Sequence, residues 1–162
     1  MNESEYVSRY AGIYEHSPWV AEETAADAAA SADIAEIATL MAECVDNASA
    51  ERQLALIRAH PDLAGKAQVA GELTADSTDE QASAGLDKCS VDEYAQFQSL
   101  NDSYKQKFGF PFVMAVRAST RAEILAAFAT RLENDAGVEF ETALQEIHKI
   151  ARLRLEAMQA EG

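Results

Sequence analysis

Apolar residues recur every three or four positions along most of the chain, which is the period of an amphipathic α-helix. In residues 33–45, for example, Ile34, Ile37, Met41 and Val45 fall on one helical face. No segment keeps the alternation of apolar and polar residues that is typical of a half-buried strand. The pattern therefore predicts an all-α protein.

Capping residues and glycines divide this pattern into separate helices. Ser90 and Glu93 form a capping-box pattern at the start of one helix, and Gly109 is placed to end it. Ser77 and Glu80 repeat the capping-box pattern at the start of another helix. Helices are predicted over residues 33–45, 49–59, 77–86, 90–109, 119–135 and 138–158. With shorter helices added, we predict a single compact bundle of about seven to nine helices, forming one domain over residues 1–162.

Composition and charge narrow the possible partners. The 162 residues suffice to bury a core, and 13 basic against 28 acidic residues give a formal net charge of −15. Nucleic acid is therefore an unfavourable partner, because phosphate contacts need a basic surface. No apolar run approaches the roughly 18 residues of a membrane span, and the first residues lack the basic start and apolar core of a secretion signal. We expect a cytoplasmic protein that binds neither nucleic acid nor membrane.

The segment LIRAHPDLAGK, residues 56–66, ends a helix at a histidine. Pro61 disfavours the α conformation for His60, so we expect its ring at a helix end and unshielded. A helix C-terminus favours the imidazolium form, which suits a proton-transfer group. The same position also fits a surface or C-capping histidine, so spacing alone leaves both interpretations open.

Two further charged residues have both a structural and a functional interpretation. Glu80 is expected as the third residue of its helix, where it serves the capping box and has a fixed direction, and Gln81 beside it offers a donor and an acceptor. Arg154 falls inside the apolar stripe of the last helix and therefore needs an anionic partner, either an internal carboxylate or a ligand. His148 falls on the polar face of that helix and is assigned no role.

The segment KFGFPFVMAVR, residues 107–117, is strongly apolar but interrupted by Gly109 and Pro111. Its backbone is therefore expected to be irregular and buried, with N–H and C=O groups that seek partners. A polar heterocycle rich in amides could supply them, and a plain core crossover loop is the alternative.

Five segments resemble one family when they are taken together. They are YEHSPWVAE, HPDLAGK, STDEQASAGL, NDSYKQKFGFPFVMAVR and EIHKIARLRL, in this order along nearly the whole chain. They resemble the decarboxylases of 2-oxo-4-hydroxy-4-carboxy-5-ureidoimidazoline (OHCU), which catalyse the last step from urate to (S)-allantoin in purine catabolism. The resemblance implies an all-helical homodimer with no metal and no organic cofactor.

The resemblance also implies roles for particular residues. By motif position the catalytic histidine is His60, and its partner glutamate is Glu80. The positions expected to contact the substrate are Pro61, Ser77, Thr78, Asp79, Glu80, Gln81, Phe112, Val113, Met114, Ala115, Val116 and Arg154. His60 is expected to be the general acid/base, with Glu80 orienting it or the ureido group of the substrate.

Two other functions remain open at this point. One is a catalytically silent helical interaction module that has kept the fold. The other is a metal site built from His60, Asp62 and Glu80, although a single histidine with two carboxylates is not an ordinary zinc ligand set.

Overall fold

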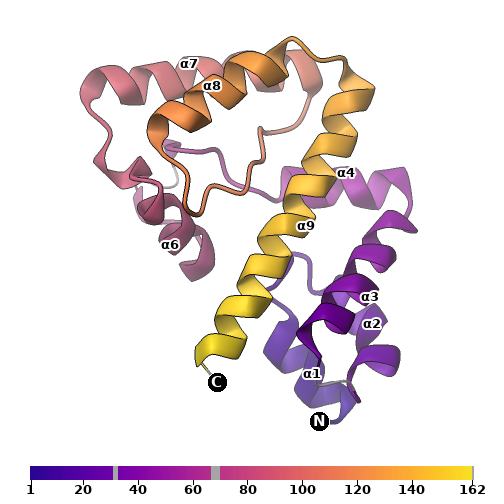
Figure 1. Cartoon of the computed structure of the whole chain (residues 1–162). Coiled ribbons are helices and arrows are strands. Elements are labelled where there is room, and N and C mark those ends of the chain that lie inside the picture. Colours follow the sequence, from indigo (N-terminus) through magenta and orange to yellow (C-terminus); the bar gives the residue numbers. More distant parts are fainter. Residues whose placement is uncertain (31–32, 67–69, 162) are drawn as a thin grey trace. The chain divides into compact units, whose positions relative to one another are not determined.

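The computed structural model describes residues 1–30, 33–66 and 70–161, and these residues form helices and connecting loops without a strand (Figure 1). The described residues contain eight α-helices and one short 3-10 helix. The elements are α1 (Glu3–Tyr10), α2 (Trp19–Ala28), α3 (Ile34–Asp46), α4 (Ala50–Arg58), α6 (Ala75–Ser83), η1 (Leu86–Lys88), α7 (Val91–Phe108), α8 (Arg121–Leu132) and α9 (Ala136–Glu161). The predicted all-α class with seven to nine helices is confirmed.

The described helices include none that is both long enough and apolar enough to cross a membrane. The chain divides into two units. The first unit comprises Met1–Ala59 and Ile147–Gly162, and the second comprises His60–Glu146. Helix α9 contributes its beginning to the second unit and its remainder to the first. The single domain expected from the sequence stays a prediction.

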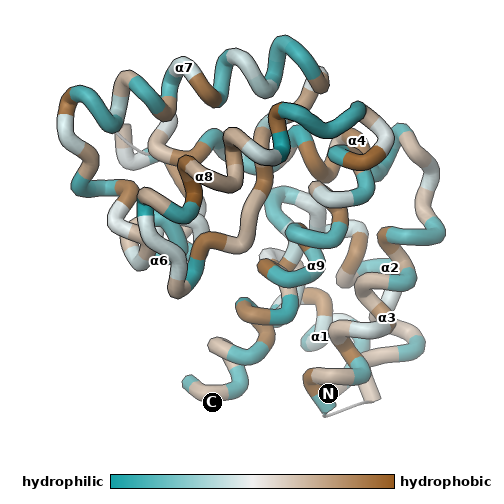
Figure 2. The backbone as a smooth tube through the Cα atoms, turned by 45° about the horizontal axis from the view of Figure 1, so that its top comes forward, coloured by the Kyte–Doolittle hydropathy of each residue, from teal (hydrophilic) through white to brown (hydrophobic). Residues whose placement is uncertain are grey.

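In the first unit, α2 packs against both α1 and α3. The predicted apolar stripe of α3 is confirmed for Ile37, Met41 and Val45, which are buried, whereas Ile34 at the helix start is half-buried. Apolar and polar stretches alternate along the helices (Figure 2), as expected for helices that bury one face.

In the second unit, an aromatic cluster joins α7, α8 and the loop between them. The rings of Phe112 and Phe128 are stacked with their centroids 3.8 Å apart. Tyr104 of α7 meets Phe112 edge-on at 5.3 Å. These contacts pack the loop after α7 against both helices, which lie side by side in Figure 1.

Most helix boundaries follow the predicted signals, but the start of α6 does not. Helix α7 has the predicted capping box of Ser90 and Glu93, and it ends at Gly109 in the left-handed conformation (φ 80°). Helix α6 begins at Ala75, and the Thr74 side chain accepts from the N–H of Ser77. The predicted cap at Ser77 is wrong, because threonine also caps a helix and the earlier start is available.

Helix α8 begins at Arg121, two residues after the serine at its predicted start. Thr120 caps α8, and its capping box is completed by Glu123. The helix then ends at Leu132, before the predicted limit of residue 135.

Removing the α7 cap should lower stability without touching the core. Ser90→Ala leaves the Glu93 N–H without its side-chain acceptor, and we expect a loss of about 1 kcal/mol in the free energy of unfolding. Urea denaturation measures this loss. The matched control is Ser99→Ala, an exposed serine within α7. Equal midpoints for the two variants would contradict the role of the cap.

Candidate functional site

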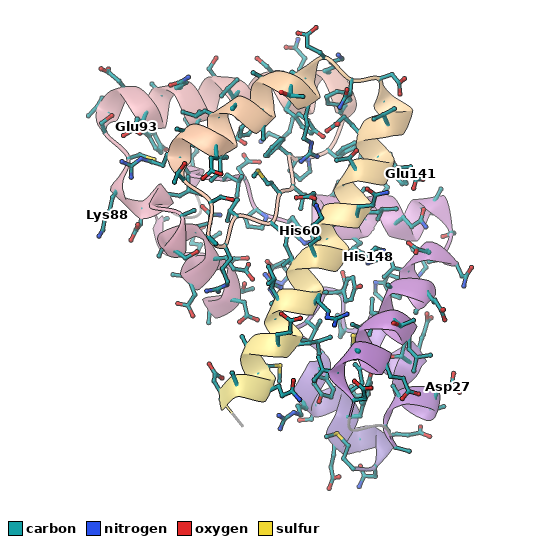
Figure 3. All side chains as sticks on the ribbon, in the orientation of Figure 1. Asp27, His60, Lys88, Glu93, Glu141 and His148 are labelled. Carbon is teal, nitrogen blue, oxygen red and sulfur yellow. The ribbon has the colours of Figure 1, made fainter. Side chains whose placement is uncertain are left out.

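His60 begins an irregular segment of the second unit that runs to Gly65. Helix α4 ends at Arg58, and the N–H of Ala59 still donates to the carbonyl of Ala55 at 3.0 Å. The predicted unshielded ring is wrong, because His60 (Figure 3) is only 8 % exposed. Leu63 and Ala64, which follow Pro61, are also buried. The whole segment therefore packs into the protein interior, and His60 is buried with it.

The packed segment contains a turn that only certain residues can form. Ala64 has a φ of 51°, in the left-handed region that is costly for a residue with a side chain. A Cβ atom added at Gly65 would lie 2.7 Å from the Cβ of Asp62, closer than such atoms approach. The turn therefore requires a glycine at position 65 on steric grounds.

The amide of Gln81 ties this turn to α6. The N–H of Ala64 donates to Gln81 Oε1 at 3.0 Å, and Gln81 Nε2 donates to the carbonyl of Asp62 at 3.2 Å. Gln81 is buried, and Glu80 precedes it on α6 with 9 % exposure. The segment that carries His60 and the helix that carries Glu80 are thus joined by two hydrogen bonds.

The other predicted contact positions on α6 differ in their exposure. Ser77 is buried, whereas Thr78 and Asp79 are exposed. The hydroxyl of Thr78 donates to the carbonyl of Thr74 at 2.9 Å, so it is engaged with its own helix. Helix α6 presents Ser77, Glu80 and Gln81 to the interior of the protein.

The alternative metal site would need three ligating side chains to converge. Within residues 1–30, 33–66 and 70–161, no group of three or more His, Cys, Asp or Glu side chains is placed to hold a metal ion.

The loop of residues 110–116 is irregular and largely buried, as predicted. Its backbone finds partners within the protein at two points. The carbonyl of Val113 accepts from Arg131 Nη1 at 2.6 Å, and the N–H of Ala115 donates to Glu146 Oε1 at 3.1 Å. Met114 and Ala115 are half-buried, whereas Phe112 is fully buried in the aromatic cluster. A contact between this loop and a ligand stays a prediction.

Arg131 belongs to a buried polar network that sequence reasoning missed. Its Nε lies 2.8 Å from Glu139 Oε1, and the Glu139 side chain is fully buried. Tyr104 donates its hydroxyl to the same oxygen at 2.5 Å, and burial together with this bond raises the pKa of Tyr104. A signal was present, because Arg131 shares the buried face of α8 with Ile124 and Phe128.

Arg154 has an internal anionic partner in the first unit. Its side chain is 4 % exposed, and its Nη2 lies 3.2 Å from Glu15 Oε2. Nη1 donates to the carbonyl of Ile13 at 3.3 Å. Of the two anionic partners predicted for Arg154, the internal carboxylate is therefore present. A contact between Arg154 and a ligand stays a prediction.

His148, also in the first unit, is more buried than its predicted polar face implied. Its side chain is 19 % exposed, with Nε2 lying 2.9 Å from Asp46 Oδ1 and Nδ1 lying 2.8 Å from the hydroxyl of Tyr14. Figure 3 labels His148 on α9. Burial raises the pKa of Tyr14, so its hydroxyl keeps its proton and the ring of His148 is hydrogen-bonded at both nitrogens.

Comparison with known proteins assigns the chain to a family. The family model described as OHCU decarboxylase matches residues 1–156. The chain belongs to the OHCU decarboxylase family. A decarboxylase of this family from Haloferax volcanii, named 2-oxo-4-hydroxy-4-carboxy-5-ureidoimidazoline decarboxylase, is 44 % identical over 155 residues, which cover 96 % of this chain and 89 % of the relative.

Two solved structures resemble this OHCU decarboxylase family member in fold. A crystal structure of (S)-allantoin synthase matches with a TM-score of 0.77 and 34 % identity, covering 97 % of this chain and 50 % of that chain. A crystal structure of OHCU decarboxylase in the presence of (S)-allantoin matches with a TM-score of 0.66 and 27 % identity, covering 84 % of this chain and 89 % of that chain.

The turn after His60 should not tolerate a side chain at position 65. Gly65→Ala brings a methyl group against Asp62, so we expect the turn to shift and the free energy of unfolding to fall by about 1–3 kcal/mol. The matched control is Gly12→Ala, because a Cβ there meets nothing within 4 Å. Urea denaturation of both variants measures the difference, and a Gly65 variant as stable as the Gly12 variant would contradict the tight turn.

The buried pair of Arg154 and Glu15 should make the arginine important for stability. Arg154→Met keeps much of the bulk but strands the Glu15 carboxylate, so we expect a loss of about 3–5 kcal/mol. The double variant Glu15→Gln/Arg154→Met removes the stranded charge and should recover a large part of that loss. Thermal or urea unfolding compares the two, and a single variant at least as stable as the double variant would reject the pair.

Proposed function

We propose that this chain decarboxylates OHCU to (S)-allantoin, as the last step of the conversion of urate to allantoin, with His60 and Glu80 as its proton-transfer pair. The family assignment makes the protein a decarboxylase of this kind, since the match extends over residues 1–156. The two residues match the motif positions of the family's catalytic histidine and its partner glutamate.

The assignment of His60 and Glu80 as a proton-transfer pair is supported by one structural observation. Gln81 binds the backbone on both sides of Leu63, and it follows Glu80 directly in α6. The helix that bears the glutamate is therefore tied to the segment that bears the histidine, and both side chains are largely removed from solvent. Such burial suits groups that exchange protons with a substrate rather than with bulk water.

The reaction can proceed without an external electron sink. When the bond to the carboxylate breaks and CO₂ leaves, its electron pair enters the adjacent C=N group of the ring, whose nitrogen takes a proton. The resulting enol then loses its hydroxyl proton while the neighbouring ring carbon gains one. Protonation of that carbon from one face produces a single enantiomer, so the protein must orient the ring and move protons.

The predicted contact residues of the second unit each have a part in this scheme. His60 is the general acid/base, and Glu80 orients either His60 or the ureido group. Amides of residues 112–116 fix the ring. Pro61 and the stretch 77–81 complete the contacts.

We further propose that the protein needs no metal or organic cofactor and that it is a cytoplasmic homodimer. Analytical ultracentrifugation tests the dimer. The competing proposal, a catalytically silent helical module, is tested by adding the protein to freshly made product of urate oxidation. An active protein produces dextrorotatory allantoin in the presence of EDTA, whereas a silent one leaves the slow racemic decay unchanged.

Removing the His60 imidazole should abolish most of the activity. We expect His60→Asn to lower kcat by about 10²-fold or more, the usual range for a general acid/base. Steady-state formation of optically active allantoin measures kcat, and circular dichroism checks helicity. The control is His16→Asn, since His16 is exposed and lies in the first unit. A His60 variant with native helicity and nearly normal turnover would remove His60 from the mechanism.

A further inference from the structure

Helix α7 directs three polar side chains toward the segment that follows His60. Gln98, Asn101 and Lys105 are spaced three and four residues apart, so they lie on one face of the helix. Gln98 Nε2 donates to the carbonyl of Ala64 at 2.7 Å. Asn101 Nδ2 donates to the carbonyl of Leu63 at 2.9 Å.

The third side chain continues this series. Lys105 Nζ lies 2.7 Å from Asp62 Oδ2 and forms an ion pair with it. Residues 62, 63 and 64 are therefore each held by one side chain of the same helix. Because the three contacts are consecutive along the segment, they fix its direction as well as its position.

Within the described residues, the buried side chain of Asn101 uses its Nδ2 group, but not its Oδ1 atom, in a hydrogen bond. The side chain is 1 % exposed, and its Oδ1 has no hydrogen-bond partner in the part of the chain that the structure describes. A buried acceptor without a partner is unfavourable. The amide nevertheless stays oriented with its Nδ2 on the carbonyl of Leu63, so that bond determines the side chain's placement.

Only Pro61 separates the held residues from His60. The proline ring restricts φ at that residue, and it also restricts the conformation of His60 before it. A displacement of residues 62–64 would therefore also displace His60, because the residue between them is not flexible. Ala64 would leave its left-handed conformation readily without external bonds, and Gln98 holds its carbonyl while Gln81 holds its N–H.

We infer that Gln98, Asn101 and Lys105 are positioning residues for His60, acting through the backbone and side-chain contacts of residues 62–64. The inference rests on the proposed function for its effect on catalysis, but not for its effect on the placement of His60. Because the α7 residues hold the histidine segment, they should affect proton transfer more than substrate binding, which is assigned mainly to other contacts.

The test compares two positioning variants with two matched controls. Gln98→Met and Lys105→Met remove the polar groups but keep unbranched side chains of similar length. The controls are Gln96→Met on α7 and Lys88→Met at η1, both of them exposed. Lys88 points away from the second unit in Figure 3. Lys105→Arg serves as the conservative variant that keeps the ion pair with Asp62.

Steady-state kinetics gives the first measurement. We expect kcat to fall about tenfold in each positioning variant and about 100-fold in the double variant, with KM within twofold of the parent. Both controls and Lys105→Arg should stay within twofold of the parent kcat. A purely structural role would instead lower the melting temperature and leave both the turnover of the folded fraction and the NMR signal of His60 unchanged, and that combination would overturn the inference.

Histidine imidazole NMR gives the second measurement, which does not depend on activity. The chain has three histidines, so the ring signals of His16, His60 and His148 can be assigned with single variants. We expect the His60 signal to shift in the two positioning variants, while the other two signals and both controls remain unchanged. A His60 signal that stays in place would overturn the inference, whatever the kinetics.

The two measurements together distinguish the positioning of His60 by α7 from the catalytic role proposed for His60. A shifted His60 signal with unchanged kcat supports the positioning of His60 by α7 and rejects the catalytic role proposed for His60. A shifted signal with the expected fall in kcat supports both.

Discussion

The hydrogen bonds of the Gln81 amide are the interaction on which the candidate site depends. One side chain of α6 accepts from the N–H of Ala64 and donates to the carbonyl of Asp62. A primary amide can meet one donor and one acceptor of a neighbouring backbone at once, which neither a carboxylate nor an amine can do. This pair of bonds satisfies a buried turn and also fixes its distance from α6. The segment that begins at His60 is thereby bound to the helix that carries Glu80.

Each unit also uses a buried arginine to hold a segment of irregular backbone. Arg131 pairs with Glu139 and binds the carbonyl of Val113, whereas Arg154 pairs with Glu15 and binds the carbonyl of Ile13. A buried ion pair is a weak source of net stability, because desolvation offsets much of the attraction. Its value here is geometric, since a guanidinium has enough donors to bind a carboxylate and a carbonyl in fixed directions.

The sequence predicted the helices well, because their signals are local. Ser90, Glu93 and Gly109 cap α7 as predicted, since each acts on its own helix end. The start of α6 was misplaced because Thr74 and Ser77 are both good capping residues, and local rules do not choose between them. A sequence pattern identifies possible caps, whereas packing decides which one is used.

The candidate site was only partly predictable, because its support comes from distant residues. His60 stood out through Pro61, but its burial depends on the turn at Ala64 and on bonds from α6 and α7 that no spacing rule reveals. Arg131 was different, since it interrupts an apolar helical face just as Arg154 does, and the same argument would have found it. His148 was misjudged because its partner Asp46 lies on another helix.

Hydrogen exchange at the amide of Ala64 tests most directly whether the segment after His60 is held in place. That amide lies in a loop, and loop amides commonly exchange rapidly, but here it donates to the buried oxygen of Gln81. If the His60 segment is fixed as described, exchange should be slower than in an unstructured peptide by about 10³-fold, which corresponds to about 4 kcal/mol of opening free energy. Exchange at nearly the rate of an unstructured peptide would show that the turn opens freely, and it would contradict a histidine held in place by α6 and α7.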